Sequence, residues 1–149
     1  MLMKTHLAMG VAGILFLLPS VTHKVSFLII ALFATLLPDI DNINSYFGRY
    51  WFLRPMQWAT KHRGLLHSFT FCLIVSIFLA FFIPIWALPF FLGYSIHLFA
   101  DSFTQEGIRP FWPFKDETAG SVYVGGSVEQ GLFYGVLLAD VVLFVRFFV

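Results

Sequence analysis

Five apolar segments account for most of this chain and constrain its fold class more than any other feature. They run approximately from Leu7 to Leu18, Val25 to Leu37, Leu65 to Ile83, Leu88 to Phe103 and Gly131 to Val149. Hydrophobic residues make up 59% of the sequence and charged residues 11%, with a mean hydropathy of +0.85, which is far from a soluble composition. Lipid does not tolerate unpaired backbone groups, so each segment is expected to be helical. The sequence therefore predicts an all-α fold, an integral membrane helical bundle of about five helices that forms a single domain over residues 1–149.

The apolar segments differ in length. The last three approach the ~20 residues that a helix needs to cross ~30 Å of hydrocarbon, and they are predicted to span the membrane. The first two have about a dozen residues each, so they either span with polar edges or form a short hairpin between neighbours. The first segment also resembles a signal peptide, with Lys4 before it and Pro19 and Ser20 after it, but an uncleaved anchor is favoured.

Basic residues are distributed unevenly between the loops. If the N-terminus is cytoplasmic, that side carries seven of the nine, so the positive-inside rule predicts a multi-pass protein with cytoplasmic long loops. The seven are Lys4, Arg49, Arg54, Lys61, Arg63, Arg109 and Lys115, and the other two are Lys24 and Arg146. They form no basic stripe, which argues against a nucleic-acid partner. The single cysteine, Cys72, excludes an intrachain disulfide framework and a cysteine-based metal site.

Histidine and carboxylate side chains stand at the ends of the apolar segments. Consecutive spans alternate in direction, so the starts of odd-numbered helices and the ends of even-numbered helices lie at one membrane face. All the candidates fall at such positions: His6, Asp39, Asp41, His62, His67, His97, Asp101 and Glu129. The sequence therefore predicts that these side chains converge on the cytoplasmic face.

Seven of these residues are candidate metal ligands: His6, Asp39, Asp41, His62, His67, His97 and Asp101. His97 and Asp101 are four residues apart, so on a helix both project from one face. In the sequence PDID, Pro38 ends a helix and places two carboxylates one residue apart. Each residue taken alone could instead be a helix cap, an interfacial residue or half of an ion pair with Lys61 or Arg63. Their joint position favours a metal site, because ionisable residues at membrane segments are costly and usually functional.

This donor set exceeds what one tetrahedral zinc ion needs. It suits two divalent ions bridged by a carboxylate of Asp41 or Asp101. Mixed nitrogen and oxygen donors favour zinc or manganese, with iron as a further candidate, over magnesium or calcium. Arg63 is a candidate for holding a phosphate or stabilising negative charge, although it could simply be a positive-inside anchor. Glu129 is a candidate general base or ligand.

The same motifs in this order resemble the YdjM/YbcI-type family of inner-membrane proteins, described as metal-dependent hydrolases. The resemblance covers nearly the whole chain and rests on His6, PDID at Pro38 to Asp41, HRGLLHS at His62 to Ser68, HLFAD at His97 to Asp101, Gly107, and PF at Pro113 and Phe114. The family pattern usually has threonine where this chain has Leu66, which removes a hydroxyl beside His67. The resemblance implies metal-dependent hydrolysis at the inner membrane.

The expected function is that of a membrane-bound metal-dependent hydrolase. A site at the interface suits a phosphoester or ester of a lipid-like, membrane-associated substrate, cleaved by a metal-activated water. The expected partners are the lipid bilayer and this substrate, and the oligomeric state is left open. Two alternatives remain, a non-enzymatic metal-binding or transport protein and a structural or regulatory membrane protein.

Overall fold

The structure is a computed structural model that describes residues 1–148 except 43–44, 46–47, 55–56 and 58–63. Within the described residues it contains five α-helices and no strand, which confirms the all-α prediction. The helices are α1 (Met3–Leu17), α2 (Lys24–Leu36), α4 (Phe69–Phe82), α5 (Pro84–Ser102) and α6 (Ser127–Phe148). Short 3-10 turns follow or precede them at Leu18–Ser20, Pro38–Asp41, Trp51–Leu53 and Leu65–His67.

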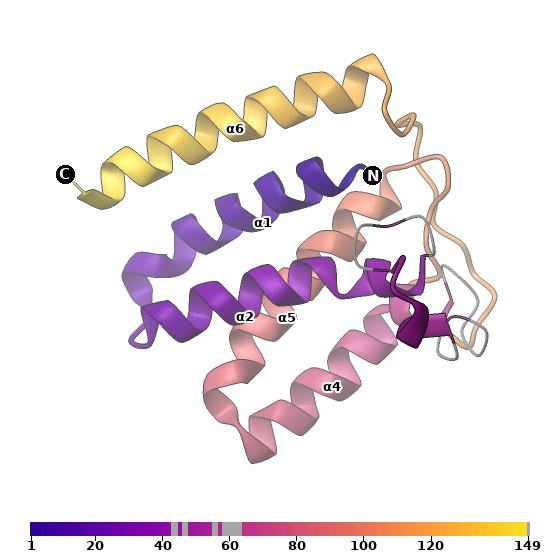
Figure 1. The fold of residues 1–149 in the computed structure, drawn as a ribbon, viewed down its shortest axis with the longest axis horizontal. Helices are drawn as coiled ribbons and strands as arrows, with labels where there is room; N and C mark the ends of the chain where they lie inside the picture. Colours follow the sequence, from indigo (N-terminus) through magenta and orange to yellow (C-terminus); the bar gives the residue numbers. More distant parts are fainter. Residues whose placement is uncertain (43–44, 46–47, 55–56, 58–63, 149) are drawn as a thin grey trace.

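The helices α1, α2 and α5 form the centre of the bundle, with α6 packed against α1 and α4 packed against α5 (Figure 1). One core cluster lies between α2, α4 and α5 and includes Ala34, Cys72, Tyr94 and Leu98. A second cluster lies between α1 and α2, and Phe147 of α6 packs against it. Since the start of α6 contacts the start of α1 through Glu129 and Leu2, these two helices run parallel.

Two helix boundaries differ from the sequence prediction. The third apolar segment begins as the 3-10 turn Leu65–His67, and α4 starts only at Phe69 because Ser68 caps it by accepting a hydrogen bond from the Phe71 N–H at 3.2 Å. The fourth apolar segment was expected to begin at Leu88, but its helix α5 begins at Pro84. This proline occupies the first position of α5, where an N–H is not needed, and Pro89 lies inside the helix.

The lengths of the apolar helices, which decide whether a helix can cross a membrane, also differ from the sequence prediction. In the described part of the chain, two helical stretches are both long and apolar enough, Met3–Ser20 with 18 residues and Ser127–Phe147 with 21. The first segment was expected to be marginal, but it reaches this length because α1 begins at Met3 and continues into the 3-10 turn Leu18–Ser20. The third and fourth segments were also expected to span, but neither α4, with 14 residues, nor α5, with 19, meets both conditions.

Small residues let the three central helices approach closely. A side chain at Gly93 of α5 would collide with the backbone carbonyl of Ala31 in α2, and a side chain at Gly10 of α1 would press on Thr35 of α2. Such small-residue contacts are a common way for helices to pack in membranes. They bring α1, α2 and α5 together at the end of the bundle that carries the candidate site.

Candidate metal centre

The candidate ligands within the described residues lie together at one end of the bundle. His6 lies near the start of α1, Asp39 and Asp41 lie in the 3-10 turn after α2, and His67 ends the 3-10 turn before α4. His97 and Asp101 lie in the last two turns of α5, and Glu129 lies in the first turn of α6. Two further candidates, His62 and Arg63, fall outside the described residues. The elements that carry these side chains are far apart in sequence and meet because the helices alternate in direction.

Asp101 is the carboxylate that contacts most of the imidazoles. Its Oδ1 lies 3.2 Å from Nε2 of His6, and its Oδ2 lies 3.7 Å from Nε2 of His67 and 3.6 Å from Nε2 of His97. All three histidine side chains are fully buried. The positively charged amino group of Met1 also lies 2.5 Å from Oδ1 of Asp101. This carboxylate therefore faces several groups that can carry positive charge or bind a cation.

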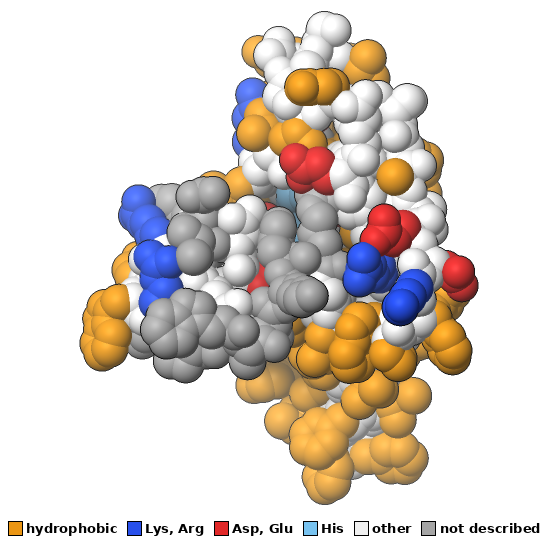
Figure 2. Space-filling view, turned by 90° about the vertical axis from the view of Figure 1, so that its right-hand side faces the viewer, with side chains coloured by type: hydrophobic (Ala, Val, Ile, Leu, Met, Phe, Trp, Pro, Cys, Tyr) orange, Lys and Arg blue, Asp and Glu red, His pale blue; other side chains and the backbone are white. Residues whose placement is uncertain are grey.

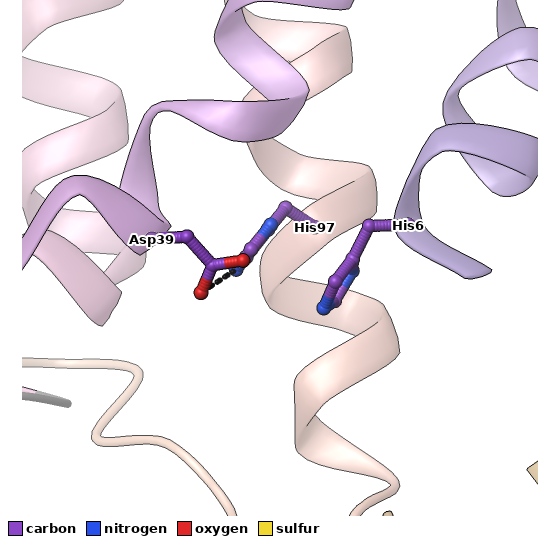
Figure 3. A group of neighbouring side chains, drawn as sticks. All are labelled: His6, Asp39 and His97. Atoms are coloured by element: carbon purple, nitrogen blue, oxygen red, sulfur yellow. Dashed lines mark ion pairs between the residues drawn. The ribbon is translucent and has the colours of Figure 1, made fainter. Parts of the chain in front are cut away.

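Asp39 lies near two of the same histidines. Its Oδ1 lies 3.9 Å from Nε2 of both His67 and His97, and its side chain is 20% exposed. Figure 3 shows Asp39, His97 and His6 reaching from separate elements toward a common region. The rings of His6 and His97 are stacked, with centroids 3.9 Å apart and planes 12° apart. Among the candidate ligands that the structure describes, Asp39 has the most access to solvent.

Asp41 contacts the other nitrogen of His67. Its Oδ2 lies 3.4 Å from Nδ1 of His67, and both side chains are buried. A carboxylate that faces the second nitrogen of a ligating histidine fixes the tautomer and the orientation of the ring. Asp41 is therefore placed to orient the His67 ring, while Nε2 of His67 faces the carboxylates of Asp39 and Asp101.

Backbone and hydroxyl groups hold two of the histidines in place. Nδ1 of His97 is 2.8 Å from the carbonyl oxygen of Thr35, which can only accept, so this nitrogen donates and Nε2 is left for a metal. The hydroxyl of Tyr94, one turn before His97, donates to the carbonyl of Leu66 at 2.5 Å. Tyr94 therefore ties the residue before His67 to α5. The sequence analysis identified neither contact, because the first uses a backbone carbonyl and the second a tyrosine inside an apolar run.

Some buried nitrogen atoms of the site make no hydrogen bond. Among the described residues, Nδ1 of His6 and Nε2 of His97 are buried without a hydrogen-bond partner, while Nε2 of His6 lies 3.2 Å from Oδ1 of Asp101. Buried polar atoms are nearly always satisfied, so a group of unsatisfied imidazole nitrogens facing carboxylates calls for a further partner. The donor separations of 3.2 to 3.9 Å in this cluster bracket the ~3.4 Å between two ligands of a tetrahedral ion with bonds of ~2.1 Å. The residues present therefore fit a divalent metal ion.

Two groups of three donors have ligand atoms within 4.8 Å of one another. One consists of His6, Asp39 and His97, and the other of His67, His97 and Asp101. Both groups include His97. Its Nδ1 is hydrogen-bonded to the Thr35 carbonyl, so Nε2 is the nitrogen that can bind an ion, and one nitrogen binds one ion. An ion bound through Nε2 of His97 could therefore use donors of both groups, and a second ion would need a bridging carboxylate.

Both carboxylate oxygens of Glu129 accept hydrogen bonds from backbone N–H groups. Its Oε1 accepts a hydrogen bond from the Leu2 N–H and its Oε2 accepts one from the Gly125 N–H, each at 2.6 Å, and the residue is 1% exposed. In this geometry Glu129 fastens the start of α1 to the start of α6.

The end of the bundle that carries the site also carries charged side chains. Figure 2 shows this face, with lysine and arginine side chains on both sides and acidic and histidine side chains visible between them. Arg109 is paired with Glu117 at 2.8 Å through its Nε. The segment that contains this pair is tied to α4, because the Phe69 N–H donates to the Pro110 carbonyl at 2.8 Å.

The sequence profile of the family described as YdjM inner membrane protein matches residues 1–146. This chain belongs to the YdjM family. The match includes every candidate ligand and all of the helices except the last residues of α6. For a YdjM-family chain, residence in a membrane is supported by the family name as well as by composition.

Two curated relatives in the YdjM family are similar to this chain. They are the inner membrane protein YdjM of Escherichia coli strain K12 and that of Shigella flexneri, each 38% identical over 92 residues. The similarity covers 56% of this chain and 47% of each relative, so the chain spans about half the length of the curated relatives it matches. No solved structure matches the chain.

Proposed function

We propose that this protein is a metal-dependent hydrolase of the inner membrane, with its site on the cytoplasmic face. The observation that carries the proposal is the group of buried imidazole nitrogens, unsatisfied in His6 and His97, that face the carboxylates of Asp39 and Asp101 at ligand-like separations. Family membership supports the membrane, and the seven-to-two distribution of basic residues supports the cytoplasmic face.

The proposed ligands of the ion are His6, Asp39, His67, His97 and Asp101. Asp41 orients His67 through Nδ1 and remains a candidate ligand, because its Oδ2 lies 3.4 Å from that nitrogen. Nitrogen and oxygen donors without sulfur suit zinc or manganese, and iron is a further candidate. The proposal keeps a pair of ions bridged by a carboxylate of Asp41 or Asp101, with His62 as a further donor that the sequence offers.

A bound divalent ion would supply Lewis acidity and a water of lowered pKa. The chain contributes the rest of the site. Asp39, which is partly exposed, marks the side from which substrate and water reach the ligands. The site lies where the apolar helices end, so a phosphoester or ester whose lipid part stays in the bilayer is the proposed substrate class.

Two residues are proposed for roles other than metal binding. Arg63 would stabilise negative charge on a phosphoester, as a positioned guanidinium does. Glu129 was a candidate general base or ligand on sequence grounds. Its two backbone hydrogen bonds favour a positioning role, in which it acts through His6.

A hydrolysis assay on purified protein in detergent, reconstituted with zinc or manganese, tests the proposal. The substrates are a phospholipid, a prenyl phosphate and a generic phosphoester. We expect turnover by wild type and by His23→Ala, which alters an exposed histidine at the other end of the bundle, but none by His97→Ala. If metal-loaded wild type is no faster than His97→Ala on all substrates, the function is non-enzymatic metal binding instead.

A further inference from the structure

A groove of about 420 Å³ lies at the end of the bundle opposite the candidate metal centre. It is formed where the ends of the parallel helices α1 and α6 lie at the same side of the molecule (Figure 1). Most of its lining is apolar, and one side chain in it carries a charge. The lining residues are Leu15, Phe16, Leu17, Pro19, Ser20, Leu143, Arg146 and Phe147.

Two cations at this end have no acidic partner among the described residues. Arg146 lines the groove, and Nζ of Lys24 lies 5.2 Å from the ring centroid of Phe147, which also lines it. Both cations are exposed, and neither forms an ion pair with a described carboxylate. Of the eight acidic residues in the sequence, seven belong to the segments around the candidate metal centre, and the eighth, Asp140, lies within α6.

The start of α2 adds to this positive character, whereas the ends of α1 and α6, which line the groove, carry a partial negative charge. Lys24 is the first residue of α2, so its ammonium group stands at the helix end that carries a partial positive charge, and no side chain caps that end. A cation in this position is unfavourable unless an anion lies nearby. No described carboxylate pairs with Lys24, so an anionic ligand would be favoured at this position.

We infer that this groove binds an anionic phospholipid, with its phosphate between Arg146 and Lys24 and one acyl chain along Leu15, Phe16 and Leu143. The groove lies between the two helical stretches that are long enough to cross a bilayer, so its apolar lining faces the lipid phase. Basic pockets between membrane helices bind acidic headgroups for the same reason, because the charges attract the phosphate and the apolar walls accept the chain. This lipid site is separate from the candidate metal centre and does not depend on hydrolysis.

Native mass spectrometry of the full chain in a mild detergent tests the inference. The lipid probes are phosphatidylglycerol and phosphatidylcholine with identical acyl chains, and inorganic phosphate is added alone in a further sample. The variants are Arg146→Gln, Lys24→Gln and Leu143→Trp, the last of which fills the groove while leaving both charges. Lys115→Gln, which removes an exposed cation at the other end of the molecule, is the matched control.

We expect wild type and Lys115→Gln to retain phosphatidylglycerol in preference to phosphatidylcholine. Each of Arg146→Gln and Lys24→Gln should lower this preference by about fivefold, the effect of one basic residue near an anionic lipid. Leu143→Trp should reduce retention of both lipids. Equal retention of the two lipids by wild type, an unchanged preference in both charge variants, or binding of inorganic phosphate as strong as that of phosphatidylglycerol would each overturn the inference.

Discussion

Nδ1 of His97 donates a hydrogen bond to the carbonyl oxygen of Thr35 at 2.8 Å, which joins the end of α5 to the end of α2. The Thr35 hydroxyl in turn donates to the Ala31 carbonyl at 2.8 Å, so its position in α2 is well defined. A backbone carbonyl has no alternative protonation state, and it therefore holds His97 in the tautomer that presents Nε2 to the carboxylates. The packing of α5 on α2 thus sets the ligand geometry.

Gly93→Ala should weaken this packing, because the added methyl group would meet the backbone carbonyl of Ala31. Overpacking of this kind costs about 1–3 kcal/mol, so we expect a lower thermal unfolding temperature in detergent. Gly131→Ala is the control, since a side chain at Gly131 in α6 would have nothing within 4 Å. A Gly93→Ala protein as stable as the Gly131→Ala protein would contradict the close contact between α5 and α2.

Tyr94→Phe should lower metal affinity while the fold is kept. The variant preserves the buried ring but removes the hydroxyl that holds the Leu66 carbonyl, so the turn carrying His67 is less well fixed. Loss of an outer partner of this type costs about 10–100-fold in metal affinity, which competition with a chelator measures. Tyr134→Phe, at an exposed position of α6, should bind metal as wild type does. Equal metal affinities of the Tyr94→Phe and Tyr134→Phe proteins would show that the Tyr94 hydroxyl does not contribute to the metal site.

The sequence was sufficient to predict the all-α class and which residues share one end of the bundle. The prediction succeeded because it depends only on apolar segments alternating in direction, which puts His6 near His97 whatever the details of packing. It could not assign His67 to a turn rather than to a helix, because that depends on Ser68 capping α4 and on Tyr94 holding Leu66. The sequence also could not predict that the Thr35 carbonyl accepts the hydrogen bond from His97. Every residue has a backbone carbonyl, and the packing of α5 on α2 decides which one lies beside His97.

The role of Glu129 could not be read from the sequence either. A carboxylate at the start of a helix is equally suited to a base, a ligand or a structural acceptor. The choice depends on whether other groups occupy its oxygens. In the structure the Leu2 and Gly125 N–H groups do so, and these contacts arise only when α1 and α6 pack in parallel.

Glu129→Gln should therefore disturb the site through α1. The amide keeps one accepting oxygen but turns an NH₂ group toward a backbone N–H, so one charge-assisted hydrogen bond worth about 1.5–3 kcal/mol is lost. We expect weaker metal binding than in wild type, but stronger than in His6→Ala, as measured by chelator competition. Glu117→Gln is the matched control, because Glu117 pairs with Arg109 at the surface. Metal loss as complete as in His6→Ala would instead make Glu129 a ligand.

Removal of metal should destabilise the protein reversibly. A ligand that binds only the folded state stabilises it by about 2.7 kcal/mol when its free concentration is one hundred times its dissociation constant. Adding a chelator to wild type should lower the unfolding temperature, and zinc or manganese in excess should restore it. His97→Ala should unfold at the same temperature with and without chelator. A chelator effect of equal size in this variant would place the stabilising metal elsewhere.

The metal content of purified protein, measured by inductively coupled plasma mass spectrometry after reconstitution and desalting, tests the central claim most directly. The site variant is His97→Ala combined with Asp101→Ala. Its control is His23→Ala combined with Asp116→Ala, which removes the same side-chain types from exposed positions. We predict at least one zinc or manganese ion per chain in wild type and in the control, and almost none in the site variant. Equal metal in all three proteins, or no metal in reconstituted wild type, would contradict the assignment of this cluster as a metal centre.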